Sequence, residues 1–245
     1  MGSGQENLNK RVEDAVRHFW TTRRRQSREQ GQASGRKDQG ARSAVTGGAQ
    51  MDGFVTLMRE LLLESGLPES TVFQEKKLEL PGYFRPEKRW DLLVVVEGQL
   101  LATIEFKSQV GPSFGNNFNN RTEETLGNAT DLWAAYREGA FRPSLRPWLG
   151  YLMLLEEAAE SLRPVGVQEP HFKVFDEFRD ASYAARYEIL LTKLLRERLY
   201  DGACLLLSNR VEGIRGKFKE PSKELGFQSF AASILAHAIA FLKTR

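Results

Sequence analysis

The sequence predicts an α/β fold with a mixed central sheet flanked by helices. Apolar residues recur at helical spacing near both ends of the chain, whereas β-branched apolar runs, typical of buried strands, occupy its middle. The elements follow the order helix, three strands, helix, strand, which favours a sheet with both antiparallel and parallel neighbours. A chain of 245 residues fits one large domain.

The first fifty residues divide into a helix and a segment with few large apolar side chains. Apolar residues between Leu8 and Trp20 predict an amphipathic helix over residues 5 to about 25. Its last turn carries three consecutive arginines, Arg23, Arg24 and Arg25. They suit the negative end of the helix dipole, and contact with phosphates is the competing interpretation. Residues 27–50 cannot form a core and predict a long loop or arm.

The rest of the chain alternates strands and helices. Asp52 is a candidate N-cap for a second helix that ends near Gly66. The patterns that follow predict a strand over 71–80, a hairpin over 89–107, a helix over about 121–136, a strand over 150–155, a helix over 183–199, a strand over 203–208 and a helix over 227–242.

The hairpin places charges on otherwise apolar strands. If Glu97, Gly98 and Gln99 form its loop, positions whose numbers sum to 196 face each other, so Asp91 lies opposite Glu105. Arg89 and Lys107 then share their face. Like charges directly opposite each other on neighbouring strands are destabilising, because their Cβ atoms lie roughly 5 Å apart. A divalent cation between the two carboxylates, with Lys107 beside it, would remove that repulsion.

Two further segments suggest contact with nucleic acid. The predicted loop after Lys107 is rich in asparagine and ends in an arginine; its polar members are Asn116, Asn117, Asn119, Asn120 and Arg121. Asn amides pair with adenine edges and Arg with guanine, although Asn and Gly also favour plain surface turns. A second basic loop, with Arg210, Arg215, Lys217 and Lys219, suits phosphates better than bases.

Composition narrows the function classes. The net charge is +3, but residues 1–50 hold ten Lys/Arg against five Asp/Glu, so the basic character is N-terminal and indicates a polyanionic partner. The sequence contains neither a membrane-length apolar run nor the apolar region of a signal peptide, and a cytoplasmic protein without membrane contact is expected. The single cysteine, Cys204, stands in an apolar run and is expected to be an inert buried thiol.

Longer strings around the hairpin resemble a known family. Asp91 followed by Glu105-Phe106-Lys107 has the form of the PD-(D/E)xK nuclease motif, which is weak by itself. The surrounding strings LPGYFRPEKRWD, IEFKSQVGPSFGNNFNNRTEE and VTGGAQMDGF are long and non-repetitive. They resemble the XhoI-type restriction endonucleases over nearly the whole chain.

The resemblance implies a restriction-endonuclease-like core and a type II restriction endonuclease. Such an enzyme makes Mg²⁺-dependent double-strand cuts at the palindrome CTCGAG, leaves 5′ overhangs and acts as a homodimer. The implied metal ligands are Asp91, Glu105 and the carbonyl of Phe106, and the implied catalytic residues are Asp91, Glu105 and Lys107. Glu60 or Glu64 could add an acidic ligand from the helix before the sheet, but surface solvation explains either residue better.

On this interpretation residues 1–245 form one endonuclease domain. Residues 1–50 form its basic helix and DNA-binding arm, and residues 51–156 form its catalytic core. Two alternatives stay open: another PD-(D/E)xK nuclease, acting in DNA repair, and a DNA-binding module without catalysis whose Asp91 and Glu105 are structural.

Overall fold

The computed structural model describes residues 2–34 and 49–244. Its α-helices are α1 (Gly2–Ser34), α3 (Asp52–Glu64), α4 (Phe114–Arg137), α5 (Ala159–Leu162), α6 (Tyr183–Arg196) and α7 (Phe227–Lys243). Its strands are β1 (Val72–Phe73), β2 (Glu79–Pro81), β3 (Glu87–Arg89), β4 (Leu92–Val96), β5 (Gln99–Gln109), β6 (Trp148–Glu156) and β7 (Gly202–Ser208). Short 3₁₀ turns are η1 (Ala49–Met51), η2 (Glu69–Thr71), η3 (Asp176–Phe178) and η4 (Gly213–Arg215).

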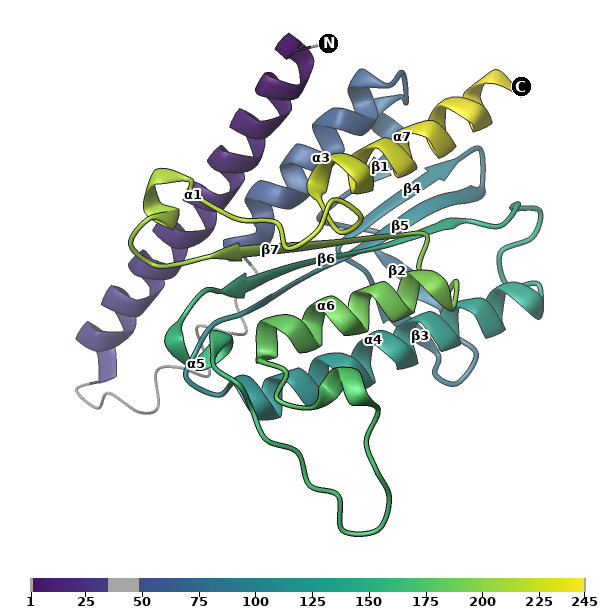
Figure 1. Cartoon of the computed structure of the whole chain (residues 1–245). Helices are drawn as coiled ribbons and strands as arrows, with labels where there is room; N and C mark the ends of the chain where they lie inside the picture. Colours follow the sequence, from purple (N-terminus) through teal and green to yellow (C-terminus); the bar gives the residue numbers. More distant parts are fainter. Residues whose placement is uncertain (1, 35–48, 245) are drawn as a thin grey trace.

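The strands form a five-stranded mixed sheet between two layers of helices (Figure 1). The sheet order is β1-β4-β5-β6-β7; β1, β4 and β5 are antiparallel neighbours, and β5, β6 and β7 run parallel. Helices α1, α3 and α7 cover one face, and α4 and α6 lie side by side on the other (Figure 1). The predicted α/β class with a mixed, helix-flanked sheet is confirmed.

Strand alternation produces two apolar cores. On β6, Leu152 and Leu154 face the α1, α3 and α7 layer, while Tyr151 and Met153 face α4 and α6. Every residue of β6 and of β7 is buried, as expected for strands covered on both faces. Cys204 lies in the first core as a buried free thiol, as predicted.

The β4–β5 hairpin has the predicted register in the part that lies away from its turn. Leu92 pairs with Ile104 and Val94 with Ala102, so the numbers sum to 196. The loop itself is shorter than predicted, because Val96 already pairs with Gln99. Glu97 and Gly98 alone turn the chain, with positive φ angles of 48° and 77°, and a β-bulge after Val94 restores the register.

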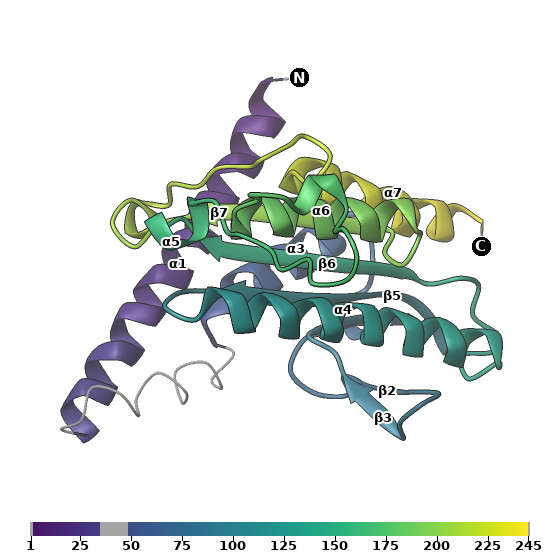
Figure 2. The same cartoon turned by 60° about the horizontal axis from the view of Figure 1, so that its bottom comes forward.

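The chain before β4 differs from the prediction. Residues 71–80 do not form one strand: β1 joins the main sheet, whereas β2 pairs with β3 in a separate two-stranded sheet. This small hairpin projects beside α4 (Figure 2). Arg89 pairs with Glu79 in it and is not part of β4, so the predicted strand assignment of Arg89 is wrong, although Arg89 lines the same cleft as Asp91 and Lys107.

Two helices begin or end elsewhere than predicted. Helix α1 continues to Ser34, so Arg23–Arg25 stand in its middle and the helix-dipole explanation for them is wrong. Residues 27–34 of the expected arm are helical, and residues 35–48 lie outside the described part of the chain.

Helix α4 begins at Phe114, so the asparagine-rich segment is helical and not a loop. Met51 occupies the N-cap position of α3 and Asp52 is the first helical residue, so the predicted N-cap is wrong by one position. None of the described helices is long and apolar enough to span a membrane.

Candidate active site

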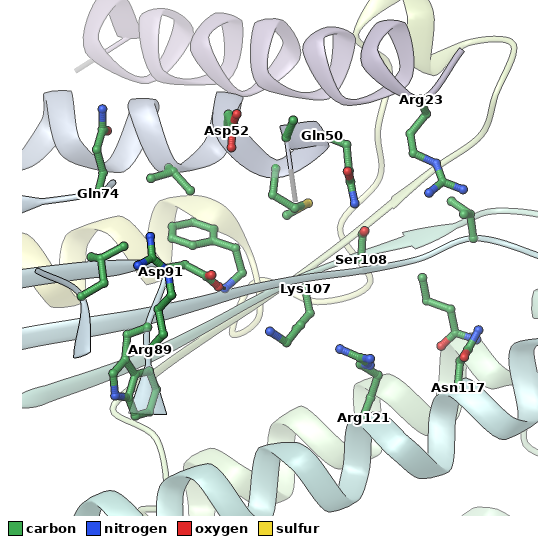
Figure 3. Close-up of a pocket in the computed structure, with 18 residues that line it drawn as sticks. Arg23, Gln50, Asp52, Gln74, Arg89, Asp91, Lys107, Ser108, Asn117 and Arg121 are labelled. Carbon is green, nitrogen blue, oxygen red and sulfur yellow. Dashed lines mark hydrogen bonds between the residues drawn. The ribbon is translucent and has the colours of Figure 1, made fainter. Parts of the chain in front are cut away.

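A cleft of about 470 Å³ opens beside the C-terminal half of β5 (Figure 3). Its walls come from α1, η1, the start of α3, the β3–β4 connection, β5 and the first turns of α4. Figure 3 shows polar side chains on both sides of the strand that carries Lys107, with Arg23 and Gln50 on one side and Arg121 on the other. The polar and charged residues that line it are Arg23, Gln50, Asp52, Gln74, Arg89, Asp91, Lys107, Ser108, Gln109, Asn117 and Arg121.

Glu105 is a buried carboxylate shared by two lysines. Only 3% of its side chain is exposed. Lys107 Nζ contacts Glu105 Oε1, and Lys88 Nζ lies 2.8 Å from Glu105 Oε2. Burial alone would raise the pKa of Glu105, but the two ammonium groups outweigh burial and lower this pKa below its ordinary value. Glu105 is therefore ionised at neutral pH in the folded chain.

Asp91 lies next to this cluster at the entrance to β4. Its Oδ2 accepts a hydrogen bond of 2.7 Å from the backbone N–H of Phe106, which ties the carboxylate to β5. Burial raises the pKa of Asp91, and the nearby charge of Glu105 raises it further. The expected juxtaposition of Asp91 and Glu105 is thus present, and the ionised form of Asp91 is disfavoured first by burial and then by the charge of Glu105.

Lys107 completes the group on the same face of β5. Burial alone would lower its pKa, but the charges of Glu105 and Asp91 outweigh burial and raise the pKa of Lys107 above its ordinary value. Its side chain is 22% exposed and reaches the cleft, with Arg121 of α4 pointing toward it from the opposite wall (Figure 3). Lys107 is therefore a charged ammonium that a substrate can contact.

The donor set suits a hard divalent cation. Carboxylate oxygens are the ligands that Mg²⁺ prefers, and one or two of them with substrate phosphates suffice. Asp91 and Glu105 provide such oxygens, and the two lysines on Glu105 show that the site attracts positive charge. The described residues include no cluster of three or more Asp, Glu, His or Cys side chains. The residues therefore fit a site completed by substrate and water.

The predicted DNA-contact residues separate into two groups. Asn117 and Arg121 lie one helical turn apart on α4, and both line the cleft. Asn116, Asn119 and Asn120 are exposed and do not line it.

The three consecutive arginines of α1 also differ in whether they line the cleft. Arg23 lines the cleft, Arg24 lies outside it, and the 68% exposed Arg25 stands 3.9 Å from Glu29.

A second hollow, the arginine groove, adjoins the cleft through Arg23. Burial lowers the pKa of Arg23, and the nearby charge of Arg210 lowers this pKa further. Arg210 is held there by Glu156 at 2.5 Å. The groove has a volume of about 350 Å³ and is lined by Trp20, Arg23, Arg24, Ser27, Arg28, Val110, Arg210 and Ile214. The other residues of the predicted basic loop pair with Glu212, Glu13 and Glu157.

Several cleft residues were not foreseen from the sequence. Gln50 is 5% exposed, and its Oε1 has no hydrogen-bond partner within the described residues. It lies in VTGGAQMDGF, so the resemblance marked its segment but gave it no role. The acidic residue of α3 that lines the cleft is Asp52. Glu60 and Glu64 pair with Arg11 of α1 and are more than half exposed, which agrees with surface solvation as the better explanation for both.

A mixed sheet with helices on both faces, and paired carboxylates beside a lysine on its antiparallel hairpin, places the chain in the restriction-endonuclease-like class. The comparisons specify the family. The model of restriction endonuclease XhoI matches residues 29–220, and the chain belongs to this family of type II restriction enzymes, which are site-specific deoxyribonucleases.

Three curated relatives agree with this assignment. The type II restriction enzyme BstVI of Geobacillus stearothermophilus is 54% identical over 211 residues, which cover 84% of this chain and 94% of the relative. AbrI of Azospirillum brasilense is 50% identical over 67% of this chain and 73% of its own, and XhoI of Xanthomonas vasicola is 48% identical over 65% of each. No solved structure matches the chain.

Proposed function

We propose that this enzyme makes Mg²⁺-dependent double-strand cuts at the palindrome CTCGAG, leaves 5′ overhangs, and uses Asp91, Glu105 and Lys107 as its catalytic residues. The observation that carries the chemistry is the buried Glu105 beside Asp91 with Lys107 reaching the cleft. Membership in the XhoI family supports the proposed recognition sequence and overhang, and the digest described below tests both.

Asp91 and Glu105 would hold Mg²⁺, together with the backbone carbonyl of Phe106. When bound, the ion lowers the pKa of a water molecule and neutralises negative charge on the scissile phosphate. Asp91 remains oriented by the Phe106 N–H, which leaves its other oxygen available. Lys107, kept protonated by its neighbours, presents a positive charge to the phosphate and orients the attacking water. These contacts stabilise the transition state more than the ground state, because negative charge accumulates as the P–O bond breaks.

The cleft walls would hold the duplex. Arg121 and Arg23 face the catalytic strand from opposite sides, and Asn117 lies one turn before Arg121 (Figure 3). Arginine contacts to phosphates position the protein, and amide contacts to base edges carry sequence information. The arginine groove continues this positive surface away from the cleft and would bind the flanking phosphate backbone.

A palindromic site cut on both strands suits a two-fold symmetric protein with one active site per strand, so a homodimer is proposed. Light scattering on the protein with and without a CTCGAG duplex measures the stoichiometry. Two chains per duplex support the proposal, and one chain per duplex contradicts it.

A plasmid digest tests the function. Plasmid DNA with two CTCGAG sites is incubated with the protein, with and without Mg²⁺, and the fragment ends are sequenced. Two fragments with 5′ overhangs at CTCGAG, formed only with Mg²⁺, are expected. A smear would instead indicate a non-specific nuclease, and intact but retarded DNA would indicate a binding module without catalysis.

A further inference from the structure

Lys88 makes a contact that the family motif does not contain. Its ammonium lies 2.8 Å from Glu105 Oε2, while Lys107 occupies the other oxygen of the same carboxylate. The Lys88 side chain is only 11% exposed. Both oxygens of Glu105 are thus occupied by cationic groups, so a metal ion can reach this carboxylate only if at least one ammonium withdraws.

The small β2–β3 sheet places Lys88 over the carboxylate. Lys88 belongs to β3, outside the main sheet, and Glu105 belongs to β5. The tip of this hairpin is fixed to α4, because Asp131 accepts hydrogen bonds from the backbone N–H groups of Tyr83 and Phe84 at 2.7 and 2.8 Å. Gly82 permits this approach, since a Cβ there would lie 2.6 Å from the Asp131 carboxylate. The position of Lys88 is therefore fixed by strand pairing within the β2–β3 sheet and by the contact of the hairpin tip with α4.

Lys88 also contacts two groups other than Glu105. Its Nζ donates a 3.0 Å hydrogen bond to the carbonyl oxygen of Arg89 and lies 4.3 Å from the centroid of the Trp90 ring. A cation over a tryptophan face is stabilised by the ring electrons. Lys107 lacks this freedom, because it stands on the same strand and the same face as Glu105, two residues along.

We propose that Lys88 is the internal counter-ion of Glu105 in the metal-free enzyme and that Mg²⁺ must displace it from the carboxylate. This inference rests on the proposed Mg²⁺ site and adds a positioning residue to it. In the metal-free site two carboxylates face two ammonium groups, so the charges of the four side chains balance and Glu105 remains ordered before the metal arrives. The contact lowers the apparent metal affinity, because only the fraction of molecules with Lys88 withdrawn can bind the ion.

The test is a calorimetric titration of the DNA-free protein with Mg²⁺. Lys88→Met removes the charge and keeps an unbranched side chain, and its Mg²⁺ dissociation constant is expected to be about tenfold lower than that of the unmodified chain. Lys88→Arg keeps the charge and is expected to bind Mg²⁺ as the unmodified chain does. Lys76→Met, at an exposed lysine before β2, is the matched control and should leave the affinity unchanged.

The Mg²⁺ dependence of thermal unfolding gives a second readout, because a merely structural lysine would leave the same deficit with and without the ion. Without Mg²⁺, Lys88→Met should unfold at a lower temperature, and saturating Mg²⁺ should remove the difference, because the ion replaces the lost charge. If Lys88→Met does not fold, Lys88→Gln serves in both measurements.

Unchanged or weaker Mg²⁺ binding by the variant, in a chain whose unmodified form binds Mg²⁺, overturns the role of Lys88 alone. Absence of Mg²⁺ binding in every form overturns the proposed cofactor as well.

Discussion

Replacing Glu105 and replacing Asp91 should change stability in opposite directions. Glu105→Gln removes the negative charge between Lys88 and Lys107 and leaves two largely buried ammonium groups without their shared counter-ion. Removing one partner of a buried charge pair costs about 3 kcal/mol at the lower end of the usual range. For a domain of this size that corresponds to a melting temperature lower by roughly 6–12 °C.

Asp91→Asn should instead raise the melting temperature of the metal-free protein. Burial and Glu105 both disfavour the ionised Asp91, whose pKa is raised. A group whose pKa is higher in the folded than in the unfolded chain costs stability once the pH exceeds its unfolded pKa, so a neutral amide relieves that cost at pH 7. The asparagine oxygen can still accept the hydrogen bond of the Phe106 N–H, so the local geometry is retained.

Thermal and urea unfolding at pH 7 without divalent ions measure both effects. Glu64→Gln is the control, because its pair with Arg11 is largely exposed and its loss should change the unfolding free energy by less than about 1 kcal/mol. The two lysines stabilise the charge of Glu105, whereas burial and Glu105 destabilise the charge of Asp91. Shifts of the same sign for Glu105→Gln and Asp91→Asn would refute this assignment.

Four further predictions concern binding and catalysis. Mg²⁺ affinity should fall as the pH falls through the raised pKa of Asp91, and calorimetry in buffers of different ionisation enthalpy should detect proton release on binding. Arg23→Gln and Arg24→Gln should each reduce the slope of log affinity against log salt by about 0.9, measured by fluorescence anisotropy, whereas the exposed Arg25→Gln should change it less. Gln50→Met should raise the unfolding free energy by about 1 kcal/mol, because it removes an unsatisfied buried oxygen, and should slow cleavage of plasmid DNA. Sedimentation of the protein with duplex should give two chains per CTCGAG site, and a value that stays at one would argue against the dimer.

The register of the β4–β5 hairpin could be predicted because both determinants are local. Strand alternation and a Gly98 turn fix which residues share a face, so Asp91 and Glu105 follow from counting. The predicted loop was one residue too long, yet the predicted pairing near Asp91 and Glu105 is correct. The bulge after Val94 accounts for this, because it adds the one residue by which the turn is shorter.

The remainder of the site depends on tertiary contacts that a sequence pattern does not encode. Lys88 reaches Glu105 because a separate hairpin is fixed to Asp131, 43 residues further along the chain. Gln50 and Asp52 line the cleft because η1 lies against β5 and α3 follows η1 directly in the chain. The start of α4 was missed because Asn and Gly have low helix propensity, and here burial of Phe114 outweighs that preference.

The most direct test of the central claim is single-turnover cleavage of a labelled CTCGAG duplex with Mg²⁺, combined with a gel-shift measurement on the same samples. Asp91→Asn and Glu105→Gln are assayed below their unfolding temperatures beside the unmodified chain and Glu64→Gln. We expect both active-site variants to bind the duplex and leave it intact while the unmodified chain and Glu64→Gln cut both strands. Cleavage by either active-site variant at the unmodified rate would contradict the assignment of this carboxylate pair as the catalytic centre.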